Sequence, residues 1–274
     1  MKKILLSIFI LIFTACSSNQ FSVATIRIKG SDTMLKLTEL LAEEFMKVNP
    51  GVSVYVSGGG TKNGIKALTR NEVDICTASR PLKSDEVKII ADNYGSLGMN
   101  FLVAKDALSI YLNPDNPVKN LTMQQLKDIF TGKITNWNEV GGEDSPILTI
   151  IRSTNSGTHL YFKDHVLNGE DYANKAIVKT TTNSVVEEIL QHENAIGYGG
   201  MGLGKEITHA SINGIKATRE ASVEGSYPIS RYLQFYTLKE PHGAVKEFID
   251  FVTSSAGQHI VEEQGFIPLW KLTY

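Results

Sequence analysis

The chain of 274 residues contains only two cysteines, Cys16 and Cys76. A network of disulfide bonds, which many small exported proteins use to support a small core, is therefore excluded. The sequence also lacks an excess of basic charge, because 27 Lys and Arg residues stand against 29 Asp and Glu residues. No sustained Lys/Arg run occurs, so we expect no binding of nucleic acid through a basic surface.

Long hydrophobic runs are also missing. The apolar run at residues 4–13 is too short to span a membrane, which takes about 20 residues. Lys2 and Lys3 precede it and Thr14-Ala15-Cys16 follows it, which predicts an export signal over residues 1–15. Small residues followed by cysteine resemble a bacterial lipobox, so we expect a lipid on Cys16 and a flexible tether over residues 16–24. An ordinary signal peptide with an incidental Cys16 is the alternative, because Phe13 stands where leucine is usual.

Motifs for metal binding and catalysis are absent too. The histidines are scattered, and neither Cys-x-x-Cys nor His-Glu-x-x-His spacing occurs, so we expect no metal site and no cofactor. Ser156 with His159 or His165 would be the candidate nucleophile and base. Because Asn155-Ser156-Gly157 lacks the Gly-x-Ser-x-Gly elbow of such enzymes, we expect no catalysis and keep a hydrolase only as an alternative.

Segments of strand type alternate with segments of helical periodicity along the chain. Apolar residues recur at helical spacing over residues 34–48, and residues 244–261 predict an amphipathic stretch with a turn at Gly257. This alternation indicates an α/β fold with a mixed, mostly parallel sheet flanked by helices. The first strands are predicted at residues 25–29, 52–56 and 73–78, and Cys76 is expected in the core.

The size of the chain predicts more than one lobe. Without residues 1–15, the chain still exceeds the usual size of a domain with a single core. A strand leaving near Ala107 and another returning near Leu233 would make the first lobe discontinuous. Two such crossings leave a hinge and a ligand cleft between the lobes. The predicted limits are residues 25–108 and 233–274 for the first lobe and residues 109–232 for the second.

Three short Ser/Thr/Gly segments, at residues 30–33, 57–61 and 155–158, each stand where a helix is expected to begin. The first N–H groups of a helix are unpaired and carry roughly half a positive charge, so small residues there let an anion approach. Taken singly, Ser31, Thr33 and Thr158 are expected to be N-caps. Together with Arg152, which follows a predicted buried strand, the segments predict one tetrahedral oxyanion held from several sides.

Several motifs occur in the order found in one family. The chain is similar to the phosphate-binding lipoproteins of the PstS type, the extracytoplasmic receptors of phosphate ABC transporters. The resemblance covers nearly all of residues 25–270 and implies a type II periplasmic binding protein fold with two lobes and no catalysis. The motifs that carry it are Gly30-Ser31-Asp32-Thr33-Met34, the Thr61 loop, Ala78-Ser79-Arg80-Pro81-Leu82, Ile129-Phe130-Thr131-Gly132, Ile134-Thr135-Asn136-Trp137, residues 152–158 and Tyr227-Pro228-Ile229-Ser230-Arg231.

The resemblance also implies a set of phosphate ligands drawn from both lobes. Arg152 would give a charge-assisted contact, while residues at helix starts would donate N–H and O–H groups. The expected phosphate-binding residues are Ser31, Asp32, Thr33, Met34, Thr61, Ser79, Arg80, Arg152, Ser156, Gly157 and Thr158.

One position departs from the family pattern. In the best-known members an aspartate follows the Ala-Ser of the third-strand loop and accepts the proton of bound phosphate, whereas Arg80 stands there in this chain. Such an acceptor discriminates against sulfate, which has no proton to offer. We expect Asp32 to be the acceptor, with a solvent-facing N-cap as its alternative. Arg80 is expected either to bind the anion or to pair with Asp32.

The sequence therefore predicts an extracytoplasmic receptor that closes around inorganic phosphate and delivers it to the permease of an ABC transporter. We expect a monomer anchored through Cys16 at the periplasmic face of a membrane or at the cell surface. The alternatives are a receptor for sulfate or molybdate, and a surface adhesin or signalling lipoprotein that keeps the fold.

Overall fold

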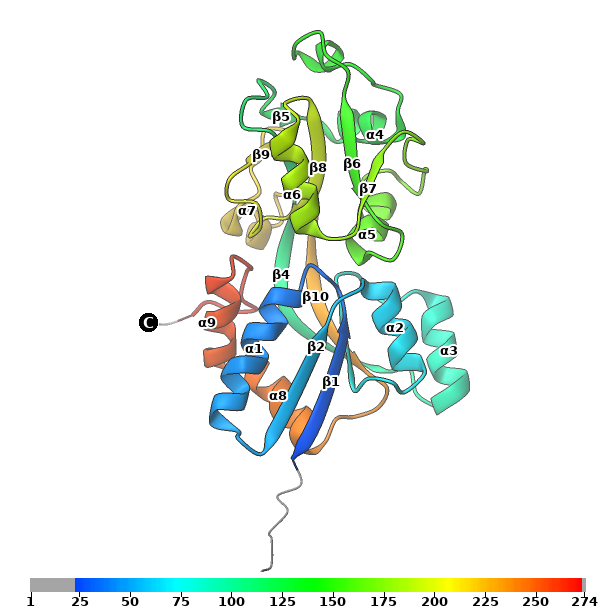
Figure 1. Cartoon of the computed structure of the whole chain (residues 1–274), viewed down its shortest axis with the longest axis vertical. Coiled ribbons are helices and arrows are strands. Elements are labelled where there is room, and N and C mark those ends of the chain that lie inside the picture. Colours follow the sequence, from blue (N-terminus) through cyan, green and yellow to red (C-terminus); the bar gives the residue numbers. More distant parts are fainter. Residues whose placement is uncertain (1–22, 273–274) are drawn as a thin grey trace, which may run out of the picture.

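The computed structural model describes residues 23–272. Figure 1 shows two lobes, one above the other, joined by the strands β4 (Met99–Leu112) and β10 (Ser230–Thr237). The predicted export signal, Cys16 and the tether up to residue 22 lie outside the described residues. Ala24, the last residue of the predicted tether, already belongs to the first strand.

Lobe 1, the lower lobe in Figure 1, is built from three further strands and five helices. In its first strand, Ile26 and Ile28 are buried while Arg27 between them is exposed. The first helix buries Leu37, Leu41 and Phe45 along one stripe, as its periodicity predicts. These elements are β1 (Ala24–Gly30), α1 (Leu35–Val48), β2 (Val52–Ser57), α2 (Thr61–Thr69), β3 (Ile75–Ala78), α3 (Ser84–Tyr94), α8 (Gly243–Val252) and α9 (Ser255–Glu263).

Lobe 2 has its own core of apolar side chains around Phe130, Phe162 and Tyr198. Its helix starts carry the expected caps: Thr122 accepts a hydrogen bond from the Gln125 N–H group, for example. Its elements are β5 (Asn120–Leu121), α4 (Met123–Thr131), a short 3₁₀ helix (Trp137–Val140), β6 (Leu148–Arg152), α5 (Gly157–His165), β7 (Ile177–Lys179), α6 (Thr182–Gln191), β8 (Ala195–Gly200), β9 (Thr208–Ile212) and α7 (Arg219–Glu224).

One mixed sheet of ten strands runs through both lobes, in the order β2-β1-β3-β10-β4-β8-β6-β7, with β9 pairing to β4 and β5. Within each lobe the pairs β1–β2, β1–β3, β6–β7, β6–β8 and β5–β9 are parallel. The antiparallel pairs all involve β4 or β10. The predicted fold class is confirmed. The helices α1, α2, α5 and α6, which follow parallel strands, begin between the lobes (Figure 1).

The strand β4 changes its partner where the chain passes between the lobes. Residues 99–107 pair with β10, the other strand that joins the lobes, and residues 108–112 pair with β8 and β9 of lobe 2. This change falls beside the predicted limit at residues 108 and 109, although the residue limits of the lobes stay a prediction.

The C-terminal helical stretch differs from the prediction. The chain breaks at Thr253 and Ser254 rather than at Gly257, which lies within α9. Thr253 is the C-cap of α8, and Ser254 caps α9, because its hydroxyl accepts a hydrogen bond from the Gly257 N–H group. Gly257 packs closely on the preceding helix, since a Cβ at this position would lie 2.3 Å from the Phe251 carbonyl oxygen.

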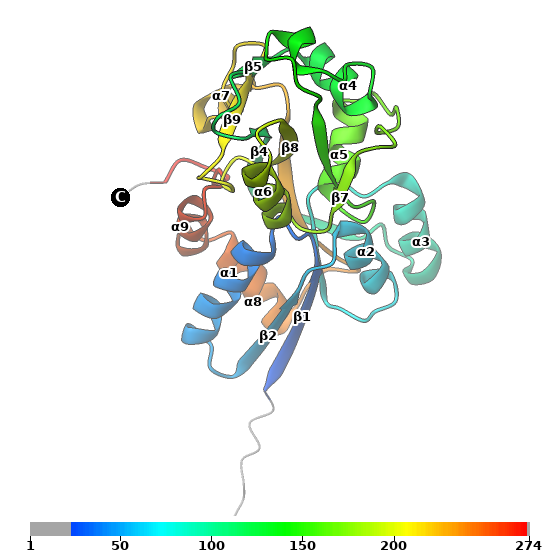
Figure 2. The same cartoon turned by 45° about the horizontal axis from the view of Figure 1, so that its top comes forward.

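Turning the molecule shows how closely the lobes meet. In Figures 1 and 2, α5 and α6 of lobe 2 face α1 and α2 of lobe 1.

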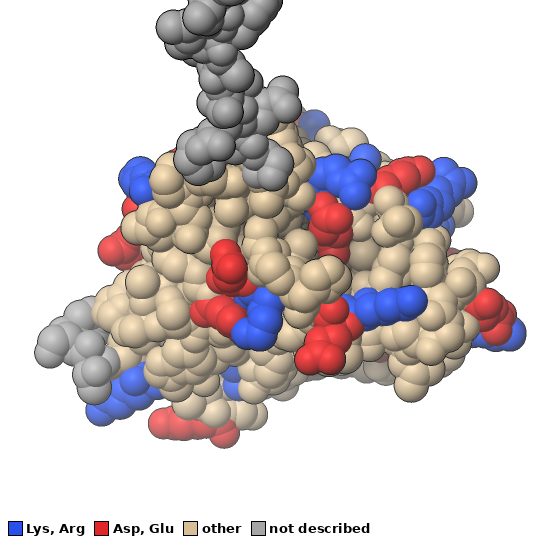
Figure 3. All heavy atoms as spheres, turned by 90° about the horizontal axis from the view of Figure 1, so that it is seen from below, with Lys and Arg blue, Asp and Glu red and all other residues tan. Residues whose placement is uncertain are grey.

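Figure 3 shows that basic and acidic side chains are intermixed on the face seen from below, so this face has no excess of one charge. Within residues 23–272, no helix is long and apolar enough to cross a membrane.

Candidate functional site

The predicted anion loops meet between the lobes. Thr61 is the first residue of α2, and Gly157 is the first residue of α5. A Cβ built on Gly157 would lie 2.4 Å from Thr61 Oγ1, and the Lys62 N–H group donates to the Asn155 carbonyl at 3.1 Å. The first turns of these helices therefore face each other across the interface, with the lobes in contact.

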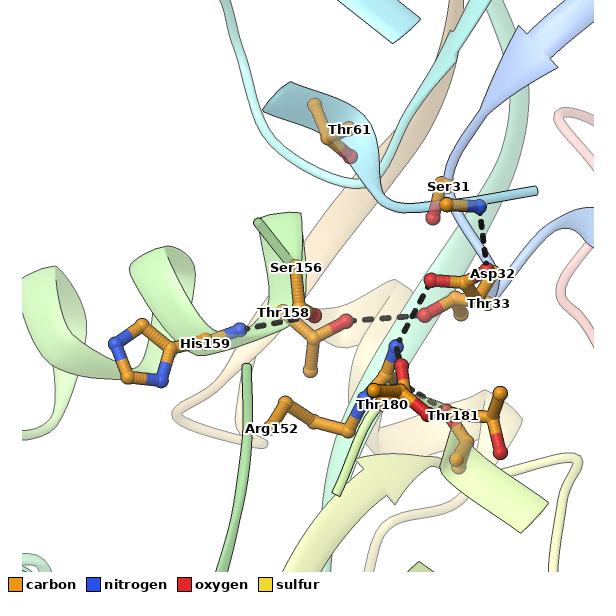
Figure 4. A network of polar contacts seen from close by, with 12 residues as sticks. Ser31, Asp32, Thr33, Thr61, Arg152, Ser156, Thr158, His159, Thr180 and Thr181 are labelled. Atoms are coloured by element: carbon orange, nitrogen blue, oxygen red, sulfur yellow. Dashed lines mark hydrogen bonds and ion pairs between the residues drawn. The ribbon is translucent and has the colours of Figure 1, made fainter. Parts of the chain in front are cut away.

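A direct hydrogen bond joins two of the predicted ligands. Thr33 Oγ1 of lobe 1 lies 3.0 Å from Thr158 Oγ1 of lobe 2, and both residues are buried. Neither hydroxyl caps a helix, because Met34 is the N-cap residue of α1 and Ser156 is that of α5. The N-cap interpretation is thus wrong for Thr33 and Thr158, whose hydroxyls point to the interface, as Figure 4 shows.

Ser31 and Met34 hold the first loop together. The Ser31 N–H group donates to Thr77, and its hydroxyl does not cap α1. The Met34 N–H group donates to the Ser31 carbonyl at 3.0 Å, while the Met34 side chain is buried in the core of lobe 1. In this arrangement the Met34 N–H group is used in a hydrogen bond within the turn.

Ser79 supports Thr61 from the end of β3. The Ser79 N–H group donates to Thr61 Oγ1 at 3.2 Å, and the two side-chain oxygens are 3.5 Å apart. Both residues are fully buried. Since Thr61 Oγ1 accepts from Ser79, its own hydrogen is free for another acceptor.

Arg152 is buried at the end of β6, where it is 1 % exposed. Its Nη1 donates to Thr182 Oγ1 at 2.6 Å and its Nη2 to the Thr180 carbonyl at 2.8 Å. Nη2 also donates across the interface to Asp32 Oδ2 at 3.2 Å, as Figure 4 shows, whereas Nε has no partner among the described residues. Burial lowers the pKa of Arg152, and the Asp32 carboxylate opposes that shift. A buried cation therefore lies at the interface, held by Thr180 and Thr182 of lobe 2 and paired with a carboxylate of lobe 1.

Asp32 belongs to the same cluster. Besides the contact with Arg152, its Oδ1 accepts from the Gly59 N–H group at 2.8 Å. The side chain is 12 % exposed, so Asp32 is not the solvent-facing N-cap that was the alternative to a proton acceptor.

Arg80 lies outside this cluster. Its guanidinium binds Glu86 of α3 through two parallel hydrogen bonds of 2.7 Å, and Nη1 also donates to the Pro81 carbonyl. The expectation that Arg80 pairs with Asp32 is wrong. Arg80 forms its ion pair with Glu86 in the first turn of α3, and Asp32 pairs with Arg152. Direct binding of an anion by Arg80 stays a prediction.

Ser156 and His159 do not form a nucleophile and base. Ser156 Oγ accepts from the His159 backbone N–H group at 3.3 Å, which is an ordinary N-cap. The imidazole ring points away from Ser156 in Figure 4 and packs against Tyr172, with ring centroids 4.5 Å apart and the planes tilted by 32°. Burial lowers the pKa of His159. Within the described part of the chain, no group of three or more His, Cys, Asp and Glu is placed to hold a metal ion.

Besides Thr180 and Thr182, the ion pair of Arg231 with Asp106 lies in the site region and was not among the predicted ligands. Arg231 of β10 contacts Ser79 and Thr158, and Asp106 of β4 binds Arg231. Arg231 ends the quoted Tyr227–Arg231 motif, and Asp106 is the acidic residue within the apolar stretch 101–112. A charged residue inside such a strand is the signal that could have revealed the pair.

Two lobes joined by crossing strands, with hydrogen-bond donors of both lobes meeting at the interface, define a two-lobed solute-binding protein. A family model described as the PBP superfamily domain matches residues 16–256. The phosphate-binding protein PstS of Pseudomonas aeruginosa is 31 % identical, over 88 % of this chain and 81 % of its own length. The PstS protein of Bacillus subtilis is 33 % identical, over 89 % and 81 %. The chain therefore belongs to the PstS family of the PBP superfamily.

Solved structures agree with this assignment. A candidate phosphate ABC transporter substrate-binding protein from Clostridium perfringens, solved with bound phosphate, is 32 % identical with a TM-score of 0.84 over 90 % of this chain and all of that one. An ABC-type phosphate transport receptor from Vibrio cholerae is 30 % identical with a TM-score of 0.74, over 88 % and 99 %. These relatives are named as binding or transport proteins, and none of these names describes an enzyme.

Proposed function

We propose that this protein captures inorganic phosphate outside the cytoplasmic membrane and delivers it to the permease of an ABC transporter, without catalysis. The observation that carries the proposal is the buried Arg152 at the lobe interface, in the same region where the Thr33 and Thr158 hydroxyls of the two lobes meet. A phosphate dianion needs charge-assisted and neutral donors from several directions, and the interface supplies both kinds. The PstS relatives and the phosphate-bound structural neighbour support the same ligand.

In this proposal the anion enters when the lobes part, and they close on it afterwards. The hydroxyls of Thr33 and Thr158, which bond each other in the closed lobes, would turn their hydrogens to phosphate. Thr61 and Ser79, together with Ser156 and Gly157 at the start of α5, complete the proposed set of donors. Binding therefore replaces contacts between the lobes with contacts to the ion, and this exchange couples occupancy to closure.

Asp32 is the proposed acceptor for the phosphate proton. Its carboxylate lies in the first anion loop and contacts Arg152, so it is fixed beside the cation that would bind the anion. Sulfate has no proton at neutral pH and would meet this carboxylate without a hydrogen bond. Asp32→Asn is expected to raise the relative affinity for sulfate, and an unchanged ratio of affinities would argue against this role.

Isothermal titration calorimetry of dialysed protein with phosphate, arsenate, sulfate and molybdate, at two pH values, tests the proposed function. Phosphate is expected to bind most tightly, and Arg152→Ala is expected to weaken binding by at least about 1.5 to 3 kcal/mol. Arg70→Ala, which changes an exposed arginine of lobe 1, is the control. Preference for sulfate or molybdate would assign another oxyanion, and near-normal binding by Arg152→Ala would show that the site lies elsewhere.

The proposed location is the outer face of a membrane, where a lipid on Cys16 would hold a monomer near its permease. In cells, Cys16→Ala is expected to release the protein from the membrane fraction, while the mass of the wild-type N-terminus is expected to include the lipid. A soluble wild-type protein would leave an ordinary signal peptide as the better interpretation.

A further inference from the structure

Arg231 and Asp106 form an ion pair between the two strands that join the lobes. The residues lie directly opposite each other in the pairing of β10 with β4. Arg231 Nε and Nη2 both donate to Asp106 Oδ2, at 3.0 and 2.9 Å, and the two side chains are 1 % and 0 % exposed. Two of the three guanidinium nitrogens are therefore fixed to the crossing strands.

The third nitrogen reaches both lobes. Arg231 Nη1 donates to the Ser79 carbonyl of lobe 1 at 3.1 Å and to Thr158 Oγ1 of lobe 2, also at 3.1 Å. Ser79 follows β3, and Thr158 lies in the first turn of α5. A single nitrogen, held from the crossing strands, thus contacts one proposed phosphate ligand in each lobe.

This contact also decides where the Thr158 hydrogen can point. A guanidinium only donates hydrogen bonds, so Thr158 Oγ1 must be the acceptor from Arg231. The hydroxyl hydrogen is then directed elsewhere, toward Thr33 Oγ1 at 3.0 Å or toward an anion. Arg231 therefore occupies one acceptor position of Thr158 Oγ1 and leaves the hydroxyl hydrogen available on the side of the interface.

We propose that Arg231 is a positioning residue for ligand binding: anchored by Asp106, it holds Ser79 and Thr158 together when the lobes are closed and orients the Thr158 hydroxyl toward the anion. This inference rests on phosphate being the ligand. A buried ion pair that only stabilised the crossing strands would affect unfolding without a specific effect on binding.

Arg231→Lys is the informative variant, because it keeps the positive charge beside Asp106 and removes the planar fork that reaches Ser79 and Thr158. Phosphate affinity by calorimetry is expected to fall about tenfold or more. Thr158→Val is expected to weaken binding too, and the double variant is expected to bind about as tightly as the weaker single variant, since both changes break one chain of contacts. Arg27→Lys, in the exposed pair of Arg27 with Asp74, is the matched control and is expected to bind like wild type.

A second readout does not depend on phosphate. Small-angle scattering in phosphate-free buffer is expected to give a larger radius of gyration for Arg231→Lys than for wild type, because the closed lobes lose their shared contact. If Arg231→Lys does not fold, the pair Arg231→Gln with Asp106→Asn replaces both charges together and serves in its place.

Affinity within about twofold of wild type for Arg231→Lys would overturn the proposal, and so would additive effects of Arg231→Lys and Thr158→Val. A wild-type protein that releases no heat with phosphate would refute the proposed function instead. In that case the scattering comparison decides alone, and an unchanged radius of gyration would overturn the positioning role.

Discussion

Gly157 of lobe 2 and Thr61 of lobe 1 approach each other so closely that a Cβ on Gly157 would lie 2.4 Å from Thr61 Oγ1 and 2.6 Å from Ser79 Oγ. The glycine is the first residue of α5, where many other residues could start a helix. Its small size is therefore required by the opposite lobe and not by its own helix.

Gly157→Ala is expected to hinder closure and to lower phosphate affinity about tenfold or more, measured by calorimetry. Urea unfolding of the ligand-free variant should show that both lobes still fold, because each has its own apolar core. Gly51→Ala is the control, since a Cβ there meets nothing within 4 Å. Wild-type affinity in Gly157→Ala would mean that the lobes bind phosphate without approaching this closely.

Much of this interface could be predicted from local sequence. A strand followed by small hydroxyl and glycine residues and then by helical periodicity locates a helix start, and helix starts after parallel strands gather at one sheet edge. Gly60, Thr61, Ser156 and Gly157 lie where this reasoning puts them. Local chemistry was sufficient because each loop is defined by its own few residues.

The ion pairs could not be predicted in this way. Arg231 and Asp106 are 125 residues apart, and their pairing depends on the register of β10 with β4. For Arg80 the expected partners were the anion and Asp32, and the structure pairs it with Glu86 instead. Sequence reveals that a buried charge needs a partner but not which partner the tertiary structure supplies.

The pair of Arg80 with Glu86 is expected to be structural. The two side chains are 4 % and 13 % exposed, so Glu86→Ala leaves a nearly buried guanidinium without its counter-ion. The free energy of unfolding, measured with urea, is expected to fall by about 3 kcal/mol or more. Arg80→Met together with Glu86→Leu should recover most of this loss, because neither charge then has to be buried.

The same double variant separates the two possible roles of Arg80. If the guanidinium serves only Glu86, phosphate affinity should stay within about threefold of wild type. A loss of about tenfold or more in the double variant would instead assign Arg80 to the anion site.

His159 is expected to make the stability of the protein depend on pH. Burial, with smaller contributions from the charges of Lys163 and Arg152, lowers the pKa of His159 from its usual 6.5 in the folded protein. As the pH falls below 6.5, His159 takes up a proton in the unfolded chain but stays neutral in the folded protein. The free energy of unfolding therefore decreases progressively below this pH. His159→Phe, which keeps an aromatic ring against Tyr172, should reduce this loss.

Urea unfolding at about pH 7.5 and about pH 5.5 measures the effect. The difference between the two pH values is expected to be smaller for His159→Phe than for wild type. His242→Asn, a change at an exposed histidine, should leave the wild-type difference in place. The same difference in His159→Phe as in wild type would assign the pH dependence to other groups.

Besides Arg152 with Asp32, Arg219 of α7 and Glu262 of α9 form an ion pair between the lobes, through Nη1 and Oε1. The side chains of Arg219 and Glu262 are 35 % and 26 % exposed, so water and salt weaken their attraction. The buried pair of Arg231 and Asp106 is not screened in this way. Arg219→Gln is expected to change the free energy of unfolding by less than about 1 kcal/mol and phosphate affinity by less than about threefold. Calorimetry at low and high salt tests whether screening is the reason. Any effect of Arg219→Gln on phosphate affinity should shrink as the salt concentration rises, whereas the effect of Arg231→Lys should persist. A large effect of Arg219→Gln that survives high salt would mean that this pair, and not the buried one, controls closure.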